Sequence, residues 1–439
     1  MPAAPRRVPD AASRDRRAGR FQLRDDYQQW THHPRAQWCG RRRLPGRDVA
    51  VKVADTVAHY SGVQLCGAVW TCPVCGPRIR QQRANDIAQA LQRWTSRHGT
   101  ASVALLTLTV PHGKHHRLAD VMATVAAGFR SLTAGRFAQQ LRADYGLAHH
   151  IKGWDVTVNV GDDGNGWHPH LHVLLFLDAP LAADQLDALR AAVYAKWRAT
   201  VTARGWDAPT AAHGVHLEVA RSRGKLADYV AKVALGDDDT TASTTTTSTD
   251  TDTAAAVAPL AFEMARGDLK RAGRAGRSYW QLLADACKPL ADADGVLDEA
   301  VDRDRDLWRE WERATAGVPS LRWSRGLRAA VRLGEELTDD EVVAEEVGGE
   351  VVYRFDASTD DWQRVCRLRG GRWAVLRAAE AGGTDAVAQL LHHIRITGSI
   401  PAPPPAATPP PALAAAPAAA PAAPTTTGTV ARPALRLAA

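Results

Sequence analysis

The sequence has 439 residues, which is too long for one ordinary hydrophobic core and predicts two or three domains. Apolar residues make up 45% and charged residues 23% of the chain, a composition typical of soluble globular proteins. No apolar run reaches membrane-spanning length, and residues 1–20 contain no apolar signal core. We therefore expect a cytoplasmic protein with no membrane partner.

The net charge of +7 lies entirely in the first fifty residues. This segment holds twelve arginines, no lysine and five aspartates, whereas the rest of the chain sums to zero. Because residues 1–36 are polar and lack apolar periodicity, we expect them to form a disordered basic arm. Such an arm suits a polyanionic partner. The alternative is a solvated tail whose arginine content follows genome composition.

Four of the six cysteines lie in one short stretch, which in a reducing cytoplasm indicates a metal site rather than a disulfide framework. Cys72 and Cys75 have zinc-knuckle spacing, in which two thiolates across a tight turn approach one tetrahedral ion. Cys66 supplies a third ligand. Cys39 would complete a structural four-cysteine Zn²⁺ site, with His59 as the competing fourth ligand and reduced structural thiols as the alternative. A closed site would hold this segment folded and present four arginines to DNA, namely Arg41, Arg42, Arg43 and Arg78.

The following elements alternate between helical and strand-like patterns. In chain order, the patterns predict a helix at 77–97, a strand at 102–110, helical spacing at 117–145, strands at 151–160 and 168–177, a helix at 181–204, a strand at 215–220 and a helix at 225–235. The segment GDDGNG at 161–166 predicts a hairpin between the two middle strands. This order favours an α+β fold in which helices cover an antiparallel sheet.

The segment WHPHLH, which ends at His172, is the most informative. Because side chains alternate along a strand, His170 and His172 point to the same face. If residues 160 and 167 pair across the hairpin, Asp155 lies opposite His172 and Thr157 lies opposite His170. Two imidazoles and one carboxylate suit a divalent cation that must also hold a substrate. Two histidines on a solvated strand face are the alternative.

A tyrosine and two lysines share one face of the helix predicted at 225–235. Tyr229 and Lys232 are three residues apart, and Lys225 precedes the tyrosine by four. A phenol has a pKa of about 10, so as a nucleophile it needs a polarised phosphate or a nearby cation. The arrangement suits attack on a phosphodiester, and a tyrosine packed on the sheet is the alternative.

Three segments, in this order, resemble the HUH endonucleases, specifically the rolling-circle replication initiators of actinobacterial plasmids and integrative elements. LLTLTVPH at 105–112 looks like the first motif, GWHPHLHVLL at 166–175 is similar to the His-hydrophobic-His motif, and ADYVAK at 227–232 is similar to the tyrosine motif. With shorter matching pieces, the likeness covers roughly residues 37–335.

The resemblance implies metal-dependent nicking and joining of plasmid origin DNA, single-stranded or in a hairpin, through a 5′-phosphotyrosyl intermediate on Tyr229. It implies that His170 and His172 are ligands of Mg²⁺ or Mn²⁺, with Asp155 as the third, and that Lys232 contacts phosphate. A host helicase and polymerase are the expected further partners.

One position departs from the family pattern. Some relatives carry a glutamate four residues before the tyrosine, where this chain has Lys225, and this departure leaves the termination chemistry open. Glu218 on the preceding strand is a possible substitute. Two alternatives remain for the function as a whole. One is a non-enzymatic, zinc-dependent DNA-binding regulator, and the other is an HUH relaxase or transposase.

The expected domain organisation follows from these segments. It comprises a disordered basic arm at 1–36, a zinc module with a helix at 37–97, the HUH nicking domain at 98–236, a disordered insertion at 237–259, a helical region at 260–335, a small α/β unit at 336–398 and a disordered Pro/Ala-rich tail at 399–439.

Overall fold

The computed structural model describes residues 11–161, 163–219, 264–265, 276–291, 295–345 and 348–401. The described residues up to Ile400 pack as one unit, the larger of the two into which the chain divides. No helix in these ranges is both long and apolar enough to cross a membrane. The finer division into domains stays a prediction, and the segment expected to form a helix at 225–235 lies outside the described residues.

An antiparallel sheet of six strands forms the centre of the larger unit, and the predicted α+β class with an antiparallel sheet is confirmed. Its strands are β3 (Val103–Leu108), β4 (Leu147–Asn159), β5 (Gly166–Leu177), β6 (Val215–Val219), β7 (Arg277–Ser278) and β8 (Leu321–Trp323). The order is β6-β3-β5-β4-β7, and β8 also pairs with β4. The first four strands coincide with the predicted ones. The two short strands come from the region that was expected to be helical.

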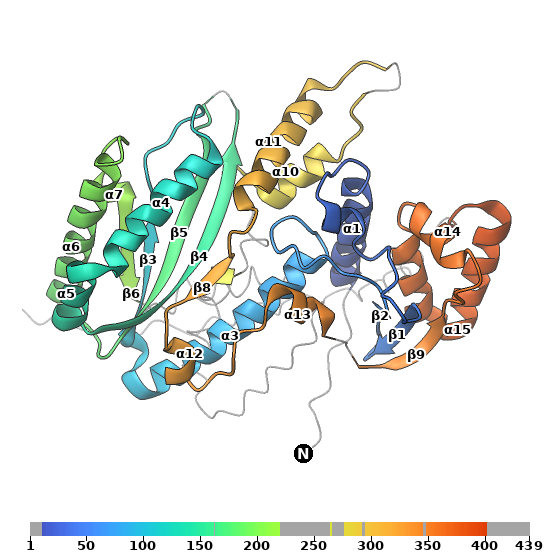
Figure 1. Cartoon of the computed structure of the whole chain (residues 1–439), viewed down its shortest axis with the longest axis horizontal. Helices are drawn as coiled ribbons and strands as arrows, with labels where there is room; N and C mark the ends of the chain where they lie inside the picture. Colours follow the sequence, from blue (N-terminus) through green and yellow to red (C-terminus); the bar gives the residue numbers. More distant parts are fainter. Residues whose placement is uncertain are drawn as a thin grey trace, which may run out of the picture. The chain divides into compact units, whose positions relative to one another are not determined.

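Helices α4 (Leu118–Thr133) and α6 (Ala183–Thr202) cover one face of this sheet (Figure 1). Leu171 and Val173 of β5 belong to the core that these helices share with the sheet. The helices approach closely because Gly128 has no side chain. A Cβ at this position would lie 2.5 Å from the Trp197 ring of α6.

Helix α3 (Cys75–His98) packs on the opposite face. Its Leu91 and Trp94 share a core with Leu174 and Phe176, the alternate residues of β5. His170 and His172 have the same strand parity as Leu174. They therefore lie on the α3 side of the sheet, farther toward the beginning of β5.

A second sheet joins segments from the two ends of the larger unit. It contains β1 (Ala50–Ala54), β2 (Val57–Ser61) and β9 (Glu350–Arg354), in the order β2-β1-β9. Helices α14 (Asp361–Arg367) and α15 (Gly371–Thr397) lie beside it (Figure 1). The cysteine-rich segment and the C-terminal α/β region therefore share one sheet and one core.

The expected disorder of residues 1–36 is wrong for the part that the structure describes. Helix α1 (Ala11–Tyr27) buries Phe21 in the core around α15 and leaves Tyr27 only 1% exposed. Its Asp25 also pairs with the buried Arg372. The partners of Phe21 and Asp25 on α15 lie about 350 residues away, so the local sequence carries little sign of them.

The remaining helices connect these layers. They are α2 (Pro34–Gln37), α5 (Gly135–Tyr145), α7 (Ala211–Gly214), α10 (Tyr279–Ala286), α11 (Glu299–Thr315), α12 (Leu327–Ala330) and α13 (Asp339–Ala344), with a 3₁₀ turn, η1 (Thr100–Ser102).

Candidate functional site

The β4–β5 hairpin sets the register of the histidine strand. Asp155 lies opposite His170, and Gly153 lies opposite His172. The predicted pairing of Asp155 with His172 is therefore wrong by two residues, because the hairpin closes at Asn159 and Gly166, one residue earlier on each strand than the assumed pair of residues 160 and 167. A shift of two residues preserves side-chain parity, so Asp155 stays on the histidine face.

The structure brings two of the three predicted cation ligands together. Asp155 Oδ2 lies 3.6 Å from His172 Nε2, and both side chains are largely buried. His170 lies on the same face, with its ring centre 6.1 Å from that of His172. Among the described residues, however, only the four clustered cysteines bring three or more ligand atoms within 4.8 Å of one another. The donors suit a divalent cation in type, but their ligand atoms do not all lie within 4.8 Å of one another.

Thr107 on β3 and Thr109, just beyond the end of this strand, orient the two imidazoles. Thr107 Oγ1 lies 3.0 Å from Nδ1 of His172, and Thr109 Oγ1 lies 2.9 Å from Nδ1 of His170. A threonine hydroxyl can accept a hydrogen bond from Nδ1–H, which leaves the lone pair on Nε2 for a cation. The sequence analysis missed this role, although both residues lie in the LLTLTVPH segment.

A second pair of histidines extends the row. His168 Nδ1 lies 2.6 Å from His112 Nε2, and the His168 ring packs edge-on against His170. Burial lowers the pKa of His112 to about 4, assisted by the charges of His168 and His116. Burial also lowers the pKa of His168, although Asp155 opposes this shift. Both imidazoles are therefore neutral near pH 7. The sequence analysis did not single out His112, although it is the last residue of the LLTLTVPH segment.

The edge strand β6 continues this face. His216 lies opposite Thr107, and Glu218 has the same parity. Glu218 Oε1 lies 2.7 Å from His216 Nε2, and both side chains are exposed. On the far side of the row, Met264 packs against Gly153, the residue opposite His172. A Cβ added to Gly153 would lie 2.7 Å from the backbone oxygen of Met264.

The three residues predicted on the tyrosine helix, Lys225, Tyr229 and Lys232, lie outside the described residues. The described chain stops at Val219 and resumes at Met264. The strand that leads into the gap presents Glu218 to the histidine face, and the residue that follows the gap packs on the same face.

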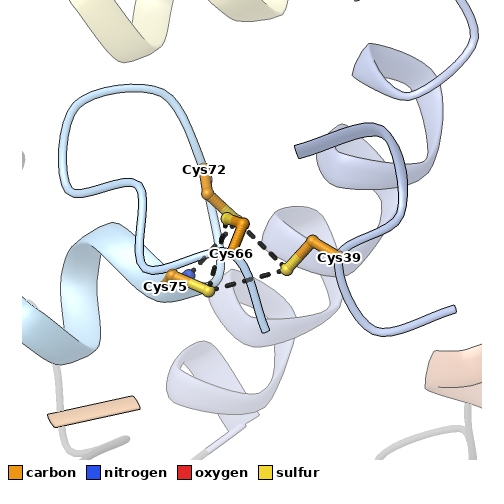
Figure 2. A group of neighbouring side chains, drawn as sticks. All are labelled: Cys39, Cys66, Cys72 and Cys75. Atoms are coloured by element: carbon orange, nitrogen blue, oxygen red, sulfur yellow. Dashed lines mark hydrogen bonds between the residues drawn. The ribbon is translucent and has the colours of Figure 1, made fainter. Parts of the chain in front are cut away.

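The four predicted zinc ligands form a buried cluster in which all sulfur atoms converge (Figure 2). Cys39 Sγ lies 3.7 Å from that of Cys72 and 3.6 Å from that of Cys75, and the Cys66–Cys75 separation is 3.7 Å. With Zn–S bonds of about 2.3 Å, the edge of a ZnS₄ tetrahedron is about 3.8 Å. The competing ligand, His59, is not a member of this cluster.

Backbone amides and charge complete the fit of this cluster to a cation. The backbone amide of Cys75 donates a hydrogen bond to Cys72 Sγ, and the backbone amide of Ala68 donates one to Cys66 Sγ. Hydrogen bonds from the other three thiols hold the pKa of Cys39 well below its ordinary value, while bonding to Cys39 raises the pKa values of Cys66 and Cys75. A divalent cation would supply the charge that four buried thiolates require.

The four arginines predicted to contact DNA divide between two places. Arg41, Arg42 and Arg43 line one groove of the surface. Arg78, on α3, lines a separate cavity of about 770 Å³ and donates a hydrogen bond to the backbone oxygen of Glu345.

Comparison with known proteins adds independent information. Residues 60–183, which include Asp155, His170 and His172, match the family described as Replication protein. A curated relative from Streptomyces lividans, named Protein rep, is 30% identical over 396 residues, covering 77% of this chain and 81% of the relative. The Neomycin resistance protein of Streptomyces cyanogenus is 27% identical over 157 residues, covering 30% of this chain and only 35% of that relative. No solved structure matches the chain.

Proposed function

The chain belongs to the replication protein family, and from this premise we propose that it initiates rolling-circle replication of a plasmid by nicking one strand of the origin DNA. The observation that carries the proposal is the row of imidazoles beside a carboxylate on one face of the central sheet. We assign this sheet to the HUH arrangement on the motifs that it carries, together with this geometry.

The proposed reaction is a transesterification. The phenol oxygen of Tyr229 attacks the scissile phosphorus, the bond from phosphorus to the 3′ oxygen breaks, and the phenol proton passes through solvent to the leaving oxygen. The products are a 5′-phosphotyrosine and a free 3′-OH, which a host polymerase would extend after a host helicase opens the duplex. Reversal of the transfer would rejoin the strand.

Described residues supply the electrostatic part of this proposal. Asp155, His170 and His172 would hold Mg²⁺ or Mn²⁺, which when bound polarises a phosphate oxygen. Thr107 and Thr109 orient the two imidazoles through Nδ1.

Two observations support a place for the tyrosine near this face. Glu218 and Met264 flank the undescribed segment that contains Tyr229, and both lie on the histidine side of the sheet. Lys232 and Lys225 are proposed to contact the phosphate. We propose that Glu218, which already bonds His216, assists hydrolysis at termination.

We also propose that the four-cysteine cluster holds one structural Zn²⁺. Its sulfur separations match a tetrahedral site, and its burial leaves no open coordination position for substrate. This ion would stabilise the fold and would take no part in nicking.

A nicking assay on an origin oligonucleotide tests the proposal. The protein is incubated with the end-labelled oligonucleotide and Mn²⁺, and the products are separated by denaturing electrophoresis. We expect a covalent protein–DNA band with the natural chain and with Tyr145→Phe, a tyrosine at the end of α5. Tyr229→Phe should lose the band completely, and His170→Ala should reduce it by at least tenfold, because both the nucleophile and its activation are needed.

The same gel separates the enzyme from a zinc-dependent regulator. A regulator would bind the origin but give no covalent band at any concentration of Mg²⁺ or Mn²⁺. Nicking at the normal rate by Tyr229→Phe would instead show that another group is the nucleophile.

A further inference from the structure

A surface groove of about 640 Å³ lies where the cysteine-rich segment meets helix α14. Four arginines line it, Arg41, Arg42 and Arg43 from the segment after Cys39, and Arg367 from α14. Trp38 and Gln363 are also in its wall, and none of the residues lining this groove is acidic. The groove is therefore strongly cationic, in contrast to the cavity beside α11, where Glu299 and Asp302 stand among the arginines.

Hydrogen bonds fix the two walls of this groove relative to each other. Trp362 of α14 donates through Nε1 to the backbone oxygen of Arg41 over 2.7 Å, and the buried Arg372 donates to the backbone oxygen of Cys39 over 2.8 Å. Arg43 Nη2 also reaches the backbone oxygen of Asp356. Because the backbones of the two walls are held together, the four arginines are carried on a preorganised surface.

Trp38 distinguishes this groove from an ordinary patch of arginines. It is 39% exposed, although it immediately precedes the fully buried Cys39. The guanidinium of Arg42 lies 4.3 Å from the centre of its ring. A cation stacked on an exposed aromatic ring, among further arginines, is the combination that nucleic-acid surfaces use to hold phosphates next to sugars or bases.

We propose that this groove binds the phosphodiester backbone of DNA, and that helix α14 of the C-terminal region thereby takes part in holding the DNA. The inference rests on the proposed function in that it takes plasmid DNA as the ligand. Planar guanidinium groups bind phosphate oxygens in pairs, and a lining without acidic groups presents no repulsion to a polyanion. Backbone contacts position a protein on DNA without reading its sequence.

Arg367→Glu tests the contribution of α14, and Arg364→Glu is its matched control. Both arginines are exposed on the same short helix, but only Arg367 lines the groove. Arg42→Glu and Trp38→Ala test the opposite wall. The zinc content and the melting temperature of each variant show whether its cysteine cluster is still folded. If Arg367→Glu has lost the folded cluster, Arg367→Gln is used in its place.

Fluorescence anisotropy would measure binding to an origin duplex, to a scrambled duplex and to a single strand, with zinc-loaded protein and no added divalent cation. We expect Arg367→Glu and Arg42→Glu to weaken binding of both duplexes at least fivefold. Each should also lower the slope of log Kd against log salt by about one, whereas Arg364→Glu stays within about twofold of the natural chain.

Two outcomes would overturn the inference. Equal affinities of Arg367→Glu and Arg364→Glu would remove α14 from the interface, and a loss confined to the origin duplex would indicate base reading instead of backbone contact. Because binding is measured without nicking, these outcomes are independent of the covalent band. Absence of that band with the natural chain would refute the proposed reaction and leave the groove to be judged on binding alone.

Discussion

At the scale of single residues, the candidate site depends on which imidazole nitrogen faces the carboxylate. Thr107 and Thr109 engage Nδ1 of His172 and His170, so Nε2 of His172 is the nitrogen near Asp155. Outer hydrogen bonds of this kind fix the tautomer and orientation of metal-binding histidines. The LLTLTVPH motif thus supplies two hydroxyls that contact the imidazoles, in addition to a core strand.

Replacement of Thr107 and Thr109 by valine should weaken Mn²⁺ binding by about 10- to 100-fold, because the imidazoles lose the hydroxyls that orient them. Isothermal titration of zinc-loaded protein with Mn²⁺ measures the effect. Serine at the same positions retains the hydroxyl and should restore most of the affinity. Valine variants that bind Mn²⁺ as tightly as the natural chain would show that the hydroxyls have no such role.

His150 makes stability depend on pH. It packs edge-on against Phe129 of α4, and burial lowers its pKa to about 4, assisted by the charge of Lys152. The unfolded chain has a histidine pKa of about 6.5, so protonation favours unfolding. The stability contribution is complete above pH 6.5 and is lost as the pH falls toward 4.

We therefore expect the natural chain to lose about 2 kcal/mol more stability than His150→Gln between pH 7 and pH 4.5. Urea unfolding at several pH values measures this difference. Other buried histidines, such as His112, shift in the same direction, so only the difference between the two proteins isolates His150. Parallel pH profiles for the two proteins would contradict the assignment.

At the scale of elements, the cysteine cluster connects a loop to the beginning of a long helix. Cys72 precedes α3 and Cys75 begins it, while Cys39 follows α2. Loss of one ligand should therefore loosen the end of α3 and its contacts with the sheet. A structural zinc site contributes its binding energy directly to folding.

Cys66→Ser should remove the bound zinc and lower the melting temperature by more than about 5 °C, which for a unit of this size corresponds to roughly 4 kcal/mol. Cys287→Ser is the control, because Cys287 is half-buried and lies outside the cluster. Metal analysis and calorimetry measure both proteins. Retention of one zinc per chain by Cys66→Ser would exclude the four-cysteine site.

The elements also show where sequence patterns are sufficient. Strands β3 to β6 follow runs of β-branched and apolar residues, so their positions were predictable. The hairpin register was missed by two residues because the turn conformation determines it, and composition does not reveal that conformation. Parity survives such an error, which is why Asp155 was still placed on the histidine face.

At the scale of the whole molecule, long-range pairing is what the sequence did not reveal. β1 pairs with β9 across about 300 residues, and Arg372 donates to the backbone oxygen of Cys39. Helix α1 is ordered by contacts of the same range, whereas its polar local sequence predicts a disordered arm. No local period carries such information.

The candidate site divides in the same way. Short, regularly spaced motifs predicted that the four cysteines cluster and where the histidine strand lies. His112 and the wall of the groove at α14 were not found, because each acquires its role from a neighbour that is distant in sequence. These distant contacts connect the cysteine cluster, the central sheet and the C-terminal region within one unit.

The central claim is that Tyr229 becomes covalently joined to the 5′ end of the nicked strand. Trypsin cleaves after Lys225 and Lys232, so residues 226–232 form a peptide in which Tyr229 is the only tyrosine. Mass spectrometry of the digested protein–DNA adduct, after nuclease trimming, should find a nucleotide phosphate on this peptide alone. The same mass on any other peptide, with this peptide unmodified, would contradict the account.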